Sequence, residues 1–548
     1  MIQKLIALPF EKALQAIGVQ EHVQLNFEIP KVSSHGDLSV NIAMVLAKKL
    51  GKSPRIIAQE ILDNLTFEPN IISSVEIAGA GFINLKYGPG FYIHALSKIL
   101  LLGETFGKSD EGTGKKVNVE YVSANPTGLL HIGHGRNTAI GDTVANLLTW
   151  TGHEVVREYY FNNAGNQMNN LALSVYARYR QAAGDVDYAF PEDGYHGSYI
   201  RQIADELVIQ YGNSLGENSK ENLEICKLAG EKWCFAAIMK TLQKMNVHQD
   251  VFFNEDSLYH DGKVQRVIDD LRAAKLAYDQ DGAVWIALSK LDEKLTDRVI
   301  VKSSGEPTYR LPDIAYHRDK LERGFDQIVD IFGADHIATI PDVMAGVQAL
   351  GLDSSKIKVL IYQFVTLTEN GEQVKMSKRT GNSYTLDDLI DELGADVVRF
   401  FFIMRGVNTH LEFDLALARE QGDRNPVFYL QYAHARITSI FTNAAENGIS
   451  NTGSVDFSLL NHPAEYNLIK TLLRFPEQIK KSAQNLEPQI LVEYLREVAS
   501  CFHVFYHECP IMKAENELRS ARLSLLKITK ITLRNGLSIL GVSAPDKM

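Results

Sequence analysis

Two short runs, far apart in the chain, limit the folds that are open to it: His131-Ile132-Gly133-His134 and Lys375-Met376-Ser377-Lys378. The first run follows an apolar, strand-like stretch and opens a helix-like segment. The second lies in a polar loop after another strand-like stretch. A strand that leads through a turn into a helix is the repeating unit of a doubly wound parallel sheet, whose ligands bind where the strands end. The pair therefore predicts an α/β fold with a ligand crevice to which both runs contribute.

The two histidines stand at the mouth of the expected helix. A helix N-terminus attracts phosphate through its unpaired N–H groups and its dipole. Two imidazoles three residues apart can both donate an N–H to one anion. Gly133 between them has no side chain, so that a flat ring can lie against the backbone. The alternative for His131 and His134 is a pair of helix-start histidines in a metal site or a packed core.

The two lysines flank a loop that is rich in small polar residues. Lysine carries a mobile point charge that suits a polyphosphate. Such a loop can close over pyrophosphate while charge builds up there and can open to release it. The alternative for Lys375 and Lys378 is a solvated basic turn. Together and in this order, the two runs predict a site that binds ATP and promotes attack on its α-phosphate.

The chain is too long for one compact core, and its patterns divide it into three domains. Residues 1–114 mix helix and strand patterns and predict an α+β domain. Residues 115–420 alternate strands and helices, which predicts a Rossmann-like doubly wound parallel sheet with a helical insertion at about 166–272. Residues 421–548 predict an all-α helical bundle. The strands expected in the middle domain are 117–123, 154–161, 283–288, 298–302, 326–332 and 358–367.

Composition excludes several classes of protein. The net charge of −11 is unevenly spread, because residues 421–548 hold 14 Lys and Arg against 12 Asp and Glu. This part of the chain could therefore lie against RNA. The four cysteines have no CxxC spacing, so that we expect no zinc and no other bound metal. No apolar stretch reaches membrane-spanning length, and the N-terminus is unlike a signal peptide. We therefore expect a cytoplasmic protein without membrane contact.

The two runs resemble the two signatures of class I aminoacyl-tRNA synthetases. Four further stretches resemble the arginyl-tRNA synthetase family, so that the resemblance covers essentially the whole chain: 119–128, 157–167, 313–320 and 534–548. The resemblance implies that ATP, accompanied by Mg²⁺, and L-arginine give arginyl-adenylate and pyrophosphate. Arginine then passes to the 3′ terminal ribose of tRNA(Arg), and AMP is released. It implies no tightly bound cofactor, and it places these residues around ATP: His131, Gly133, His134, Lys375, Met376, Ser377 and Lys378.

Arginine brings a planar cation with five N–H donors, for which carboxylates are the best partners. By similarity to the family, Glu120 and Asp313 hold the guanidinium and Tyr309 contacts the substrate. Asn125 and His131 contact its amino and carboxylate end. The alternative for the two acids is ordinary charge at strand ends. Because lysine would leave two carboxylates poorly paired, we expect about 10⁴-fold rejection of lysine and no editing domain.

The resemblance also implies contacts with tRNA. The first domain resembles the family's additional domain that touches the tRNA elbow, which points to Phe82 and Asn84. The last domain resembles the family's anticodon-binding domain, in which exposed Tyr429 and Tyr432 could stack on bases beside Arg436. The alternative is that these aromatic residues belong to the core.

We expect a monomer. The residues alone leave three other functions open: a synthetase for another amino acid, a small-molecule nucleotidylyltransferase, and a non-catalytic tRNA-binding protein of the same fold.

Overall fold

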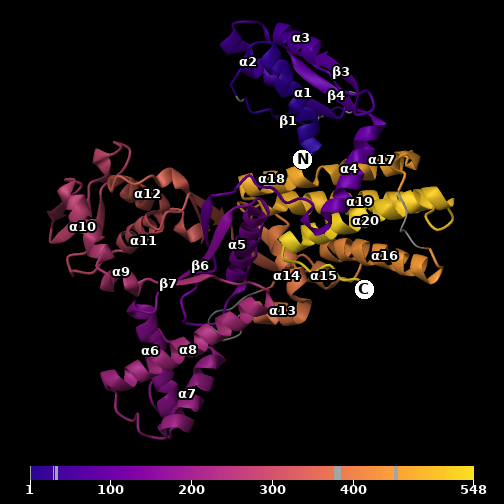
Figure 1. Ribbon diagram of the computed structural model, residues 1–548. Coiled ribbons are helices and arrows are strands. Elements are labelled where there is room, and N and C mark those ends of the chain that lie inside the picture. Colours follow the sequence, from indigo (N-terminus) through magenta and orange to yellow (C-terminus); the bar gives the residue numbers. More distant parts are fainter. Residues whose placement is uncertain are drawn as a thin grey trace.

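The computed structural model describes residues 2–21, 23–28, 30, 32, 35–374, 384–449 and 455–548. The lysine run at 375–378 lies outside these ranges. Figure 1 shows a small domain that stands on a group of long C-terminal helices through α4 (Pro89–Leu102), with a central sheet beside them. Three helices, α6 (Gly165–Ala182), α7 (Ser198–Tyr211) and α8 (Lys220–Lys244), project from the sheet.

The N-terminal domain is α+β, as predicted. Its four-stranded antiparallel sheet has the order β1-β2-β4-β3, and β3 and β4 form a hairpin in which Ala78 lies opposite Phe82. The strands are β1 (Phe27–Glu28), β2 (Leu38–Val40), β3 (Ile72–Ala78) and β4 (Phe82–Tyr87), and the helices are α1 (Ile2–Ala16), α2 (Ile42–Leu50) and α3 (Pro54–Asn64).

The middle domain contains the predicted parallel sheet. Five strands follow the order β12-β11-β5-β6-β7, and every neighbouring pair is parallel. They are β5 (Lys116–Glu120), β6 (Glu154–Phe161), β7 (Val251–Asn254), β11 (Gln327–Gly333) and β12 (Ile357–Tyr362). Because the chain continues from β5 to β6 on one side and reaches β11 on the other, the strand order reverses beside β5. In such sheets this switch point is where ligands bind.

Two of the expected strands do not belong to this sheet, which corrects the prediction for 283–288 and 298–302. They are β9 (Ala283–Ile286) and β10 (Arg298–Val301), and with β8 (Ala277–Gln280) they form a separate antiparallel sheet. The reason is the turn Asp281-Gly282, whose φ angles of 53° and 76° make a tight hairpin, whereas parallel neighbours need a long crossover.

The predicted helical insertion is also too long. Its helical part is α6 to α8, which ends at Lys244, and β7 then joins the parallel sheet. The short helices α9 (Asp256–His260) and α10 (Lys263–Ala273) follow before the antiparallel sheet. The apolar run of β7 is only four residues long and lies between helices, so that it gave little strand signal.

The remaining elements of the middle domain surround the sheet. Helix α5 (Ile132–Trp150) makes the crossover from β5 to β6, and its buried residues include Ala139, Val144 and Leu148. The expected strand at 358–367 is divided between β12 and β13, and β13 belongs to a third sheet of order β14-β13-β15. The other elements are α11 (Arg310–Glu322), α12 (Ile340–Ala349), β13 (Val365–Glu369), β14 (Glu372–Gln373), α13 (Leu386–Leu393), α14 (Ala395–Ile403), β15 (Leu411–Asp414) and α15 (Leu415–Arg419).

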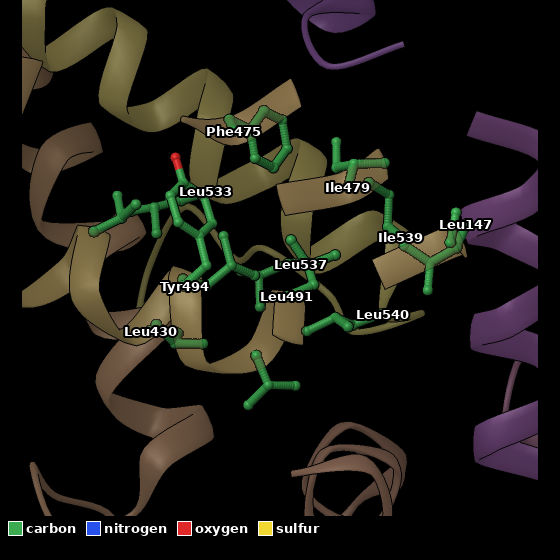
Figure 2. Close-up of a cluster of buried hydrophobic side chains, with 14 of the residues drawn as sticks. Leu147, Leu430, Phe475, Ile479, Leu491, Tyr494, Leu533, Leu537, Ile539 and Leu540 are labelled. Atoms are coloured by element: carbon green, nitrogen blue, oxygen red, sulfur yellow. The ribbon is translucent and has the colours of Figure 1, made fainter. Parts of the chain in front are cut away.

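The predicted C-terminal helical bundle is confirmed, and its described residues contain no strand. It consists of α16 (Pro426–Glu446), α17 (Pro463–Leu473), α18 (Phe475–Asn485), α19 (Pro488–Glu508) and α20 (Asn516–Ile539). Figure 2 shows Leu147 of α5 in the same apolar cluster as Ile479, Leu537 and Ile539 of the bundle. The helix that starts at the histidine run therefore packs directly on the bundle.

Candidate active site

The two histidines form the N-terminal cap of α5. The Nδ1 atom of His131 accepts the Gly133 N–H at 3.1 Å, and the Nδ1 atom of His134 accepts the His131 N–H at 3.2 Å. Their rings stack with centroids 3.7 Å apart. Because both Nδ1 atoms accept hydrogen bonds, the neutral rings carry their protons on Nε2, from which each can donate to an anion.

The alternatives for this run gain no support. His131 is exposed and His134 is half-buried, so that they are not packed in a core. Within the described ranges, no group of three or more His, Cys, Asp or Glu side chains is arranged to hold a metal ion. An anion site at the start of α5 agrees best with the geometry.

The loop between β5 and α5 is tied to the end of β6. The Asn125 side chain accepts the Asn162 N–H at 3.0 Å and donates to Gln167 Oε1 at 2.8 Å. The Tyr159 hydroxyl donates to the Ala124 carbonyl at 2.6 Å. In the structure the Asn125 side chain thus holds this loop, and its contact with the substrate stays a prediction.

Helix α11 is fixed on the sheet by buried charges. Lys320 lies between Glu120 of β5 and Asp330 of β11, with Nζ–O distances of 2.5 and 2.6 Å. His317 contacts the other Asp330 oxygen at 3.0 Å. Burial raises the pKa of Asp330, but Lys320 and His317 outweigh this effect and hold it well below its usual range. These pairs set the orientation of α11.

A second set of bonds joins α11 to β6. Both Arg323 Nη atoms donate to the buried Glu158 carboxylate, at 2.6 and 2.7 Å, and the Tyr316 hydroxyl donates to it at 2.7 Å. Charged, two-point contacts of this kind are strong and directional. The first turn of α11, which carries Asp313, is therefore held at a fixed place beside the strand ends.

Asp313 lies in a cluster of acids. Burial raises the pKa of its carboxyl to about 7; His317 opposes the shift, and the charges of Glu255 and Glu120 add to it. The Glu255 backbone N–H donates to the Phe161 carbonyl at the end of β6, at 2.9 Å. Its side chain accepts the Tyr160 hydroxyl at 2.7 Å.

The basic residues of α11 do not neutralise this pair. Lys320 and Arg323 bind other carboxylates, and among the described residues no ion pair is formed to Asp313 or Glu255. Two half-buried carboxylates that have no cationic partner in the described part of the chain form a site that favours a positively charged ligand.

Glu120 already has partners within the protein. Its side chain is only 3% exposed, its Oε2 atom binds Lys320, and its Oε1 atom accepts the Ser123 hydroxyl at 3.0 Å. The carboxylate thus already has a cation of its own. Tyr309, by contrast, lies at the start of α11 with 87% of its surface exposed, where a ligand could reach it.

Glu255 was not predicted from the sequence. It follows β7, which lies within the stretch of about 166–272 that the sequence pattern predicts as a helical insertion. The signal that could have found it is the run Val251-Phe252-Phe253-Asn254-Glu255, an apolar stretch that ends in an acid, like the stretch that ends at Glu120.

The residues predicted to contact tRNA lie in two places. Phe82 is half-buried at the start of β4, and Asn84 is 8% exposed with its Oδ1 accepting the Ser39 hydroxyl at 2.7 Å. On α16, the Arg436 guanidinium lies 5.1 Å from the Tyr432 ring centroid, and Tyr429 packs 4.9 Å from His503 of α19. The α16 residues thus form one half-buried aromatic and cationic cluster.

Three family models match the chain in order. They are "Arginyl tRNA synthetase N terminal domain" at residues 4–87, "tRNA synthetases class I (R), catalytic domain" at 95–399 and "DALR anticodon binding domain" at 430–548. An arginine–tRNA ligase of Salinibacter ruber is 47% identical over 98% of both chains, and one of Desulfotalea psychrophila is 48% identical over 95% of this chain and 94% of its own.

The chain belongs to the arginyl-tRNA synthetase family. As a class I member it is an arginine–tRNA ligase that uses ATP, arginine and tRNA, which confirms the predicted function and enzyme class. In this family the bundle is the anticodon-binding domain.

Solved structures agree with the fold. A putative arginyl-tRNA synthetase of Campylobacter jejuni aligns with a TM-score of 0.77 and 31% identity, over 84% of this chain and 99% of its own. The arginyl-tRNA synthetase of Thermus thermophilus aligns with a TM-score of 0.77 at 22% identity over the whole of both chains. In the described part of this chain, none of the helices combines the length and apolar character needed to cross a bilayer.

Proposed function

We propose that arginine binds between Asp313 and Glu255 and that ATP binds over the start of α5, so that both substrates meet at the carboxyl ends of β5, β6 and β7. The observation that carries this proposal is the pair of carboxylates without a described cationic partner, beside a sheet whose helix α5 begins with stacked histidines. Glu120 then has a different role from the predicted one, because it helps to hold Lys320 and α11.

The first step needs no side-chain nucleophile. An oxygen of the arginine carboxylate attacks the α-phosphorus of ATP, the bond to the β-phosphate oxygen breaks, and pyrophosphate leaves. His131 and His134 donate from Nε2 to the phosphate oxygens as charge develops there. Mg²⁺ enters with ATP as part of the substrate complex. Catalysis comes mainly from positioning and from stabilised charge.

We assign Lys375 and Lys378, with Met376 and Ser377 between them, to the pyrophosphate. This run lies outside the described residues, but the chain just after it returns to the histidines. Thr385 and His131 form an isolated antiparallel β-bridge, and the Leu386 N–H donates to the Leu130 carbonyl at 2.9 Å. The return of the chain to His131 supports one site for both runs.

In the second step a hydroxyl of the terminal ribose attacks the carbonyl carbon of the adenylate, and AMP leaves. We place the anticodon loop on the cluster of Tyr429, Tyr432 and Arg436, because aromatic rings and guanidinium groups stack on unpaired bases. We place the tRNA elbow against Phe82 and Asn84 of β4, of which Phe82 is half-buried and Asn84 buried.

The working form that we propose is a cytoplasmic monomer with domains at 1–114, 115–420 and 421–548. The four cysteines are unpaired, which suits a reducing compartment. We also propose that lysine is rejected at the binding step, because its single ammonium would leave one of two carboxylates poorly paired.

The test is attachment of labelled arginine to unfractionated tRNA, together with ATP–pyrophosphate exchange with and without that tRNA. We expect charging with arginine and none with lysine. Charging with another amino acid would favour a different synthetase. Exchange with transfer to a small acceptor would favour a nucleotidylyltransferase, and tRNA binding without either activity would favour a binding protein.

A further inference from the structure

The chain leaves β5 through a strained turn. Val122 and Ser123 have φ angles of 69° and 44°, in the left-handed region that disfavours residues with a side chain. Seven non-glycine residues of the described chain have positive φ, and Val122 is the only β-branched one. A buried β-branched residue stays in this conformation only if its surroundings hold it there.

The residue that holds it is Asn137 of α5. Its Oδ1 atom accepts the Val122 N–H at 2.6 Å, and its Nδ2 atom donates to the Ile331 carbonyl of β11 at 2.7 Å. Asn137 is only 5% exposed. One amide therefore bridges the ends of β5 and β11, at the point where the strand order reverses.

The turn lies between two proposed half-sites: the phosphate site at the start of α5 and the arginine site at Asp313 and Glu255. On one side, the loop that starts at Ser123 ends at His131. On the other, the Ser123 hydroxyl accepts the Tyr160 N–H at 3.1 Å, and Tyr160 holds Glu255. If the turn relaxed, the phosphate site and the arginine site would shift relative to each other.

We propose that Asn137 is a positioning residue, whose amide keeps the Val122–Ser123 turn in the conformation that aligns arginine with the α-phosphate of ATP. This inference rests on the proposed function of the site. It predicts an effect on kcat rather than on binding, because each half-site stays intact while their alignment is lost. Misplacement of reacting groups by about 1 Å can cost about 100-fold in rate.

The test is a double-mutant cycle with Asn137→Ala and Val122→Gly. Glycine adopts a positive φ without steric cost, so that the turn of the V122G variant needs no clamp. We expect N137A to lower the kcat of pyrophosphate exchange, measured with tRNA present, by about 10- to 100-fold. The KM values for ATP and arginine should change less than about threefold. Addition of V122G to N137A should restore kcat at least about fivefold, although V122G alone lowers it slightly.

Asn146→Ala is the matched control. Asn146 lies on the same helix, and its amide donates to the Ile539 carbonyl at 3.2 Å, away from the strand ends. V122G should give no rescue in the N146A background. If N137A does not fold, Asn137→Asp replaces it. This variant keeps the acceptor for the Val122 N–H, so that V122G should again give no rescue, and a rescue there would overturn the proposal.

The proposal would also be overturned if N137A and V122G lowered kcat independently, so that their effects simply added in the double variant. An N137A variant with full kcat would overturn it too. Either result would leave Asn137 a purely structural role. A wild-type protein that neither exchanges pyrophosphate nor charges tRNA would instead contradict the proposed function, and the inference would fall with it.

Discussion

At the scale of single residues, the balance of charge around Asp313 links arginine binding to pH. Burial and the neighbouring acids raise its pKa to about 7 when no cation is bound. Guanidinium binds the ionised form and stays charged itself at all relevant pH values. Protons therefore compete with arginine at pH values below about 7.

We predict that the KM for arginine rises as pH falls below about 7, by up to about tenfold per pH unit, and that the KM for ATP does not follow it. Asp313→Asn should raise the KM for arginine at high pH and remove most of this dependence. Measurement of pyrophosphate exchange between pH 5.5 and 8.5 tests the prediction, and a steep arginine KM profile that persists in D313N would argue against it.

At the scale of elements, the docking of α11 depends on a buried lysine. Without Lys320, Glu120 and Asp330 would remain buried without their cation, and their pKa values would rise. The folded protein would then hold more protons than the unfolded chain above about pH 4, so that its stability would fall as pH rises.

We predict that Lys320→Met lowers the free energy of unfolding by about 3–5 kcal/mol, and by more at pH 8 than at pH 5.5. Urea unfolding at both pH values measures this. Lys302→Met removes an exposed pair with Glu306 and should cost less than about 1 kcal/mol at either pH. An equal loss for K320M at both pH values would contradict the account of the buried carboxylates.

The strands also show which features of the fold a sequence pattern can predict and which it cannot. The range predicted for the second strand of the sheet, 154–161, is that of β6, because this strand has clear turn signals on both sides. The strands at 283–286 and 298–301 were placed in the wrong sheet, since an apolar strand pattern does not distinguish parallel from antiparallel partners. The Asp281-Gly282 turn does make this distinction.

Sequence patterns also bear unequally on the residues of the proposed site. The histidines are local, and the cap that they form follows from their position at the start of a helix. Which acid receives the substrate depends on partners that are distant in sequence. Lys320 is 200 residues from Glu120 along the chain, so that nothing near Glu120 shows that its charge is already neutralised. Glu255 of the proposed arginine site follows β7, whose four-residue run carries little strand signal.

At the scale of the whole molecule, one buried arginine joins three parts of the chain. Arg399 of α14 binds Asp142 of α5 at 2.5 Å, and it donates to the Met245 carbonyl after α8 at 2.8 Å and to the Leu540 carbonyl after α20 at 3.2 Å. These contacts link the helix of the histidines to the insertion and to the anticodon-binding domain.

We predict that Arg399→Ala lowers the free energy of unfolding by about 3–5 kcal/mol, because it leaves the buried Asp142 carboxylate with only the more distant Arg157, at 4.0 Å, as its cationic partner. Arg272→Ala removes a surface pair with Asp279 and should change stability by less than about 1 kcal/mol. Unfolding in urea, followed by tryptophan fluorescence, compares the two variants. A loss for R399A as small as that for R272A would show that the junction contributes little.

The central claim is that Asp313 and Glu255, rather than Glu120, receive the cation of arginine beside the nucleotide. Its most direct test is the KM for arginine in pyrophosphate exchange with tRNA present, measured for Glu255→Gln and Glu120→Gln. We predict that E255Q raises this KM by at least about 10-fold with little change in the KM for ATP, since a charged hydrogen bond contributes about 1.5–3 kcal/mol. E120Q should mainly lower stability. An unchanged arginine KM in E255Q, with a large increase in folded E120Q, would contradict the claim and restore Glu120 as the substrate ligand.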